Sequence, residues 1–165
     1  MGAWQSVAED VLRSRYSALV AHATFVSGSR DGAEDLVHDA FIATFSRVRP
    51  FPNAIAAEAY VRRAIVTKYL DRAKASSRAR QATERLGAQP VHVPDVSAGV
   101  GGDVADVLVG LSPRERACVT LRYIDQLSTA ETAHALGLAE GSVKRYLADA
   151  SRKVAALVTQ EGGAQ

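Results

Sequence analysis

Residues 128–147 read STAETAHALGLAEGSVKRYL, and this stretch decides the fold of the C-terminal half. Ser128 has Glu131 three residues later, which is the capping-box spacing that starts a helix. Gly137 ends this short helix, because glycine adopts left-handed backbone angles without strain. A longer helix is expected over residues 142–158. A short capped helix, a glycine turn and a longer helix form the plan of a helix-turn-helix motif.

The second helix of this motif opens with polar and basic residues. Such a helix enters the major groove of DNA by its first turns, where its side chains reach base edges and phosphates. The candidate DNA-reading residues are Ser142, Lys144, Arg145 and Tyr146. DNA binding is the preferred interpretation, and a purely structural helical hairpin is the alternative.

Two further helices are expected before this motif. The first is a short helix over residues 104–109. Ser112-Pro113-Arg114-Glu115 then supplies an N-cap serine, a proline at the first helical position and an early acid, so a helix should run to about Asp125. Together these segments predict a C-terminal helical domain over residues 104–160.

The N-terminal part shows three amphipathic helical patterns. They cover residues 4–26, 31–48 with Asp31 as the expected N-cap, and 56–80; Pro50 and Pro52 separate the last two. We therefore expect an all-α protein with a first domain over residues 1–81. Residues 82–103 lose the periodicity and are rich in glycine and proline, which predicts a flexible acidic linker between the two domains.

The charge is unevenly distributed along the chain. The net charge is only +2, but residues 60–85 hold eight basic and two acidic residues. A band of this kind suits a polyanion, and a solvated helix face is the alternative. Asp35 and Asp39 lie four residues apart, so they share one helix face. Two like charges at that spacing favour a cationic partner, with simple solubility as the alternative.

Several classes of function are not indicated. A single cysteine and scattered histidines predict neither a disulfide framework nor a metal site. The sequence has no phosphate-binding glycine motif and no nucleophile–histidine–carboxylate set. We expect no catalytic residue, no cofactor and no small-molecule substrate. The N-terminus does not resemble a signal peptide, and no apolar run would insert into a membrane, which favours a cytoplasmic location.

The motifs resemble those of bacterial extracytoplasmic-function sigma factors, in family order and over nearly the whole chain. Residues 31–41 (DGAEDLVHDAF), 59–66 (AYVRRAIV) and 70–72 (LDR) are similar to the family's region two. Residues 111–116 (LSPRER), 121–123 (LRY) and 127–137 (LSTAETAHALG) resemble its region four. The resemblance implies a three-helix region-two domain and a helix-turn-helix region-four domain, joined by the linker.

The resemblance also implies roles and partners. Asp35, Asp39 and Ile42 would bind the beta-prime coiled coil of core RNA polymerase, and the beta flap is a further implied contact on polymerase. The residues expected to contact the minus-ten element are Phe51, Asn53, Arg62, Arg63, Lys68 and Arg72. The helix with Ser142 would read the minus-thirty-five element. An anti-sigma factor is a further implied partner. The sequence departs from the family at residues 144–147, where KRYL replaces the usual KSRL, so the promoter cannot be inherited from a relative.

Three other hypotheses remain. A stand-alone helix-turn-helix regulator would leave the paired carboxylates and the basic third helix without a joint purpose. A recombinase or other DNA-processing enzyme would need a catalytic serine or acidic cluster before the linker, and the sequence offers none. A degenerate sigma-like protein that only sequesters a partner would fail to direct promoter initiation in a purified system.

Overall fold

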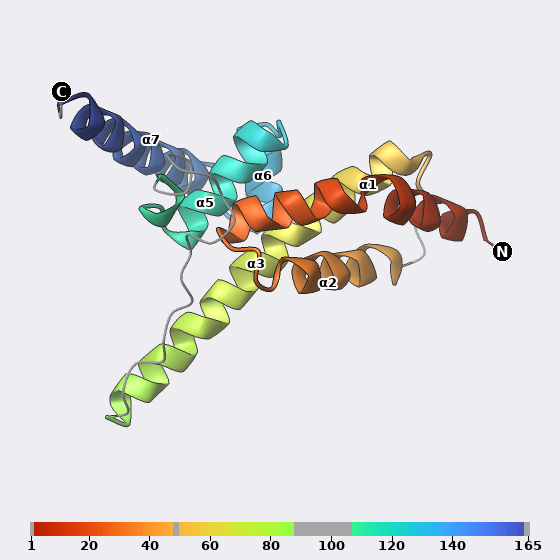
Figure 1. Ribbon diagram of the computed structural model, residues 1–165, viewed down its shortest axis with the longest axis horizontal. Helices are drawn as coiled ribbons and strands as arrows, with labels where there is room; N and C mark the ends of the chain where they lie inside the picture. The colour runs from red at the N-terminus through yellow and green to blue at the C-terminus, as the bar shows by residue number, and fades with distance from the viewer. Residues whose placement is uncertain (1, 48–49, 88–106, 164–165) are drawn as a thin grey trace.

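The computed structural model describes residues 2–47, 50–87 and 107–163. Every regular element in these ranges is a helix, which confirms the all-α prediction (Figure 1). No helix in these ranges is both long and apolar enough to cross a membrane. Most of the predicted linker, including all of residues 88–103, lies outside the described ranges.

The N-terminal half is formed by α1 (Ala3–Ser27), α2 (Ala33–Phe45) and α3 (Ala54–Arg85). Buried side chains on all three helices share one apolar core, and these include Val11 and Leu19 of α1, Val37 of α2 and Ile65 of α3. The start of α2 differs from the prediction. Gly32, not Asp31, is the N-cap, and it adopts a left-handed φ of 76° with no side-chain cap hydrogen bond. The tight glycine turn moves the helix start past the aspartate.

Helix α3 is longer at both ends than the sequence pattern predicted. It begins after Asn53, whose side chain accepts a hydrogen bond from the backbone N–H of Ala56 at 2.9 Å. It ends at Arg85, so residues 82–85 are helical and the linker cannot begin at residue 82, which corrects the predicted boundary. This segment is rich in good helix formers and extends a helix that is already nucleated.

The C-terminal half contains α5 (Pro113–Val119), the π-helical turn η1 (Thr120–Ile124), α6 (Thr129–Leu136) and α7 (Glu140–Gly162). Ser112 and Ser128 are the N-caps, as predicted, and each forms a complete capping box. Gly137 adopts a φ of 64° at the end of α6, also as predicted. Helix α7 starts two residues earlier than expected and runs past residue 160, so Ser142 lies within its first turn.

The two halves pack against each other in the structure. Leu121 and Leu127 belong to the same apolar core as α1 and α3, and Phe25 of α1 packs against a smaller cluster that contains Leu108 and Ala150. In Figure 1, α5, α6 and α7 lie together against one end of α1, and the last turns of α3 project from the body. The sequence patterns did not predict this contact between the halves.

Candidate nucleic-acid and partner interfaces

One face of α2 presents two carboxylates and an apolar side chain to solvent. Asp35, Asp39 and Ile42 follow the spacing of a single helix face, and all three are exposed, Ile42 at 65%. Asp39 pairs with Arg72 of α3 across a 2.5 Å contact, and both side chains remain about half exposed. The other side of α2 is buried against α1 and α3. This geometry fixes the exposed face in place and leaves it open to a partner.

In the loop before α3, the side chains of Phe51 and Asn53 are both engaged in contacts within the protein. The Phe51 ring packs edge-on against Phe45, with ring centroids 5.5 Å apart, and against Tyr60 at 5.4 Å. The Asn53 side chain caps α3. The neighbouring Ile55 is 79% exposed. The loop is therefore anchored by Phe51 and Asn53, and Ile55 in the first turn of α3 is a large exposed apolar side chain next to it.

The four basic residues predicted on α3 differ in their contacts. Arg72 pairs with Asp39, as described above. Arg62 is only 25% exposed and bonds to Glu58 and Asp125. Arg63 lies 3.9 Å from Glu131 of α6, with its guanidinium over the Tyr60 ring. Lys68 is half-buried, and no hydrogen bond or ion pair engages it in the part of the chain that the structure describes.

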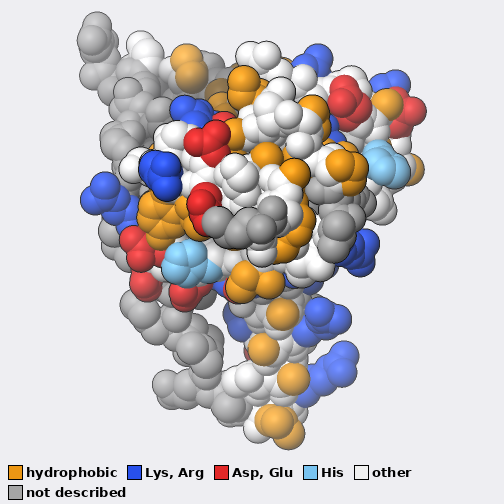
Figure 2. Space-filling model, turned by 90° about the vertical axis from the view of Figure 1, so that its right-hand side faces the viewer, with side chains coloured by type: hydrophobic (Ala, Val, Ile, Leu, Met, Phe, Trp, Pro, Cys, Tyr) orange, Lys and Arg blue, Asp and Glu red, His pale blue; other side chains and the backbone are white. Residues whose placement is uncertain are grey.

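Helix α3 carries basic side chains beyond these residues as well. Figure 2 shows Lys and Arg side chains along its projecting end, where Lys74, Arg78, Arg80 and Arg85 are all exposed. Like charges gathered on an exposed helix favour binding of a polyanion.

The first turns of α7 expose their basic side chains. Lys144 and Arg145 are exposed, Ser142 is half-buried, and the buried Val143 holds the helix against the core. The Tyr146 hydroxyl accepts a hydrogen bond from Arg114 of α5 at 3.1 Å. This bond holds the pKa of Tyr146 below its usual value. Lys144 and Arg145 are thus the exposed basic side chains at the start of α7. The Arg145 guanidinium lies over the Tyr146 ring, 5.3 Å from its centroid, and Tyr146 is tied to α5.

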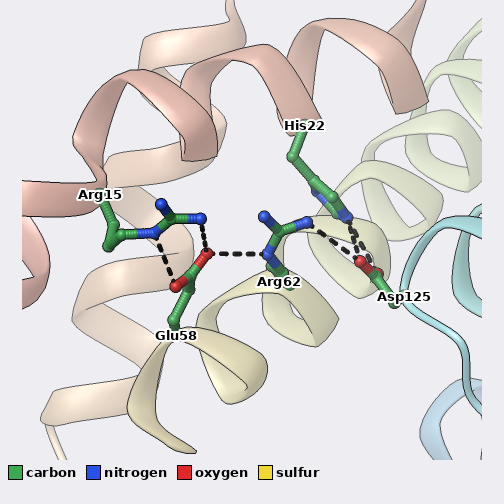
Figure 3. Close-up of polar contacts among 5 residues, drawn as sticks. All are labelled: Arg15, His22, Glu58, Arg62 and Asp125. Atoms are coloured by element: carbon green, nitrogen blue, oxygen red, sulfur yellow. Dashed lines mark hydrogen bonds and ion pairs between the residues drawn. The ribbon is translucent and has the colours of Figure 1, made fainter. Parts of the chain in front are cut away.

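A polar network that the sequence analysis missed joins α1, α3 and the loop after η1 (Figure 3). Arg15 donates two hydrogen bonds to Glu58, at 2.8 and 3.0 Å. Arg62 bonds to the same carboxylate at 3.1 Å and to Asp125 at 3.4 Å. His22 Nε2 lies 2.9 Å from the Asp125 carboxylate.

The network holds its charges by mutual hydrogen bonding. Burial tends to raise the pKa of Glu58, but the bonds from Arg15 and Arg62 outweigh this and hold the pKa below its usual value. The His22 and Asp125 side chains are 1% and 6% exposed. A sequence signal for these partners is hard to see, because His22 and Asp125 lie 103 residues apart.

The described residues contain no group of three or more His, Cys, Asp and Glu side chains that could hold a metal ion. The candidate surfaces in the described part of the chain consist of exposed charged side chains on α2, α3 and α7.

Comparisons with known proteins agree with this description. Residues 102–154 match the family described as Sigma-70, region 4. The chain is 32% identical to RNA polymerase sigma-E factor of Streptomyces coelicolor over 139 residues, which cover 84% of this chain and 78% of that protein. It is 33% identical to the protein of the same name from Streptomyces avermitilis over 142 residues, with the same coverage.

A solved structure has the same fold. The sigma factor RpoE in complex with the anti-sigma factor NepR, from Bartonella quintana, superimposes with a TM-score of 0.61 at 21% identity. The match covers 92% of this chain and 96% of that one.

The chain belongs to the RNA polymerase sigma factors, in the extracytoplasmic-function class. Its function is that of an alternative sigma factor in transcription initiation.

Proposed function

We propose that this sigma factor binds core RNA polymerase through the exposed face of α2 and contacts promoter DNA through α3 and α7. The observation that carries the proposal is the α2 face, where Ile42 is 65% exposed beside Asp35 and Asp39. A large exposed apolar side chain beside two exposed carboxylates on the same helix face would suit docking of a basic partner. The predicted partner is the beta-prime coiled coil, with the beta flap as the second contact, to region four.

The promoter contacts follow from the exposed charges. Lys144 and Arg145 on α7 would read the minus-thirty-five element, because a helix in the major groove presents its first turns to base edges. Arg62, Arg63, Lys68 and Arg72 on α3 would neutralise phosphates of the melted minus-ten strand. Exposed Ile55 would pack against an extruded base, and Phe51 and Asn53 would shape the loop that precedes it. Ser142 and Tyr146 would position α7.

The protein supplies recognition and strand separation, and the polymerase supplies bond formation, so the chain itself is not an enzyme. It would act in the cytoplasm, with polymerase. An anti-sigma factor is a further proposed partner, since the Bartonella protein of the same fold was solved with NepR.

The test is the affinity for purified core polymerase of the double variant Asp35→Arg/Asp39→Arg. We expect binding to weaken about a hundredfold or more, since each reversal replaces attraction by repulsion. The matched control is Glu9→Arg/Asp10→Arg, which makes the same charge change on exposed positions of α1. Wild-type affinity of the α2 variant would contradict the proposed docking face, as would equal weakening by the control.

A further inference from the structure

Two arginines, Arg114 of α5 and Arg145 of α7, engage the side chain of Tyr146. Arg114 donates a hydrogen bond to the Tyr146 hydroxyl at 3.1 Å, and the Arg145 guanidinium lies 5.3 Å from the centroid of the Tyr146 ring. The bond from Arg114, and to a smaller extent Arg145, hold the pKa of Tyr146 below its usual value, as expected for a phenol beside two cations. One aromatic side chain therefore connects α5 to a basic side chain at the start of α7.

The Tyr146 ring is restrained at both ends. It is half-buried and packs against the apolar core that includes Leu136 and Val143. Val143, one turn earlier on α7, is fully buried, so rotation of α7 would expose an apolar side chain to water. The hydroxyl end of the ring is bonded to Arg114. The ring therefore offers Arg145 a surface whose position is fixed by α5, α7 and the core.

No carboxylate competes with this ring for Arg145 in the part of the chain that the structure describes. The acid on the same helix face, Asp149 at four residues' distance, forms its ion pair with Arg152 instead. Arg145 itself is exposed. Its charge is thus not neutralised by a neighbouring acid, and its contact within the protein is to Tyr146.

Contact with an aromatic ring suits an arginine that reads a base. The guanidinium group uses its flat face on the ring, and its N–H edge can still donate hydrogen bonds. In the major groove, the commonest specific contact of arginine is a pair of hydrogen bonds to O6 and N7 of guanine. A side chain that is oriented before binding loses less conformational entropy when it makes that contact.

We propose that Tyr146 and Arg114 are positioning residues for base selection: the Tyr146 ring orients the Arg145 guanidinium towards a guanine of the minus-thirty-five element, and Arg114 holds the ring. This inference rests on the proposed reading of that element by α7. It gives Tyr146 a role beyond the placement of α7 as a whole, since the ring determines the direction of one neighbouring side chain.

The test measures the base preference of the holoenzyme formed by core polymerase and the full chain. The probe is duplex promoter DNA selected from a genomic library, with its minus-thirty-five positions randomised, and bound molecules are sequenced. Arg145→Ala identifies the base pair that Arg145 reads. Tyr146→Leu should lower the preference for guanine at that same base pair about tenfold and leave the other positions unchanged.

Two milder variants test the bond from Arg114. Tyr146→Phe keeps the ring and loses the hydroxyl, and Arg114→Met removes the donor of the same hydrogen bond. Each should lower the guanine preference about threefold. The double variant should show no further loss, because both substitutions remove one interaction. Additive losses in the double variant would contradict the role of Arg114.

Tyr123→Leu is the matched control. Arg122 lies over the Tyr123 ring at 5.5 Å, so η1 contains a second arginine–tyrosine contact of the same kind outside α7. This variant should keep the wild-type base preference, and far-ultraviolet circular dichroism verifies that every variant remains helical.

Two results would overturn the proposal. The first is an equal loss of affinity for all sequences in Tyr146→Leu with unchanged base preference, since Tyr146 would then only support α7. The second is preference at the Arg145 base pair for a base other than guanine. Unchanged base preference in Arg145→Ala would contradict the proposed reading by α7 itself, so the failure of that proposal is distinguishable from the failure of this inference.

Discussion

The thiol of Cys118 is fully buried on α5, beside a charged neighbour. Burial raises the pKa of this thiol from 9.0 to about 11, and the Glu115 carboxylate adds to the shift. Both effects disfavour the thiolate in the folded state. Cys118 is therefore a core residue, in accord with the apolar side chains around it.

The raised pKa of Cys118 predicts a loss of stability in alkaline solution. The unfolded chain releases this proton near pH 9 and the folded protein only near pH 11. The thiol's contribution to the free energy of unfolding is therefore fully present below pH 9 and falls as the pH rises from 9 to 11. We expect a decrease on the order of 2 kcal/mol in urea unfolding across this interval.

Cys118→Ala is the control for this decrease. The variant loses some stability at every pH because it leaves a small cavity. Its unfolding free energy should fall less steeply between pH 9 and 11 than that of the wild type. Parallel curves for the two proteins would show that the thiol does not titrate as described.

Among the elements, α3 changes from a partly buried to a mostly exposed helix along its length. Its buried positions end at Leu70, and the side chains from Lys74 to Arg85 are mostly exposed. The sequence there is rich in alanine and arginine, which form helices well. The projecting turns continue a helix that is already nucleated in the core, so they avoid the cost of starting one.

Hydrogen exchange should reveal this division of α3. Backbone N–H groups of residues 79–85 should exchange about a hundredfold or more faster than those of residues 61–70, because fraying costs little and core opening approaches global unfolding. Helix α1 is the internal comparison, since it has buried side chains as far as Val26. Uniform protection along α3 would mean that its projecting end packs against something in solution.

At the scale of elements, local signals were enough to predict most of the helices. Ser112, Ser128 and Gly137 take part in contacts between neighbours in the chain, and such contacts are visible in sequence spacing. Asn53 offers a similar signal, since asparagine is a preferred N-cap and its side chain caps α3. The family resemblance predicted a different role for it, as a contact to DNA. The predicted start of α2 at Asp31 was wrong, because Gly32 adopts a left-handed conformation and is itself the N-cap.

For the molecule as a whole, the sequence could not predict how the halves meet. Hydrophobic periodicity shows which face of a helix is buried, but not which helix covers it. The sequence alone does not distinguish an Arg62 that is free to bind a phosphate from one that already bonds to a carboxylate of the protein. The structure shows the second case, with Glu58 and Asp125 as partners. The candidate surfaces on α2 and α7 were easier to predict, because exposed charge follows from a helix face alone.

The contact between the halves uses arginines that are also proposed to bind DNA. Arg62 and Arg63 belong to the contact between the halves in the free protein and to the proposed DNA surface in the polymerase complex.

The most direct test of the account is run-off transcription with purified core polymerase on a pooled promoter library, with sequencing of the transcript starts. We predict discrete new transcripts that depend on the protein and share one minus-thirty-five and one minus-ten element. Lys144→Ala/Arg145→Ala should lose the preference for the minus-thirty-five element, since each good base contact contributes about 1–3 kcal/mol of discrimination. Absence of discrete transcripts, while the protein binds duplex DNA without polymerase, would contradict the account and favour a stand-alone regulator.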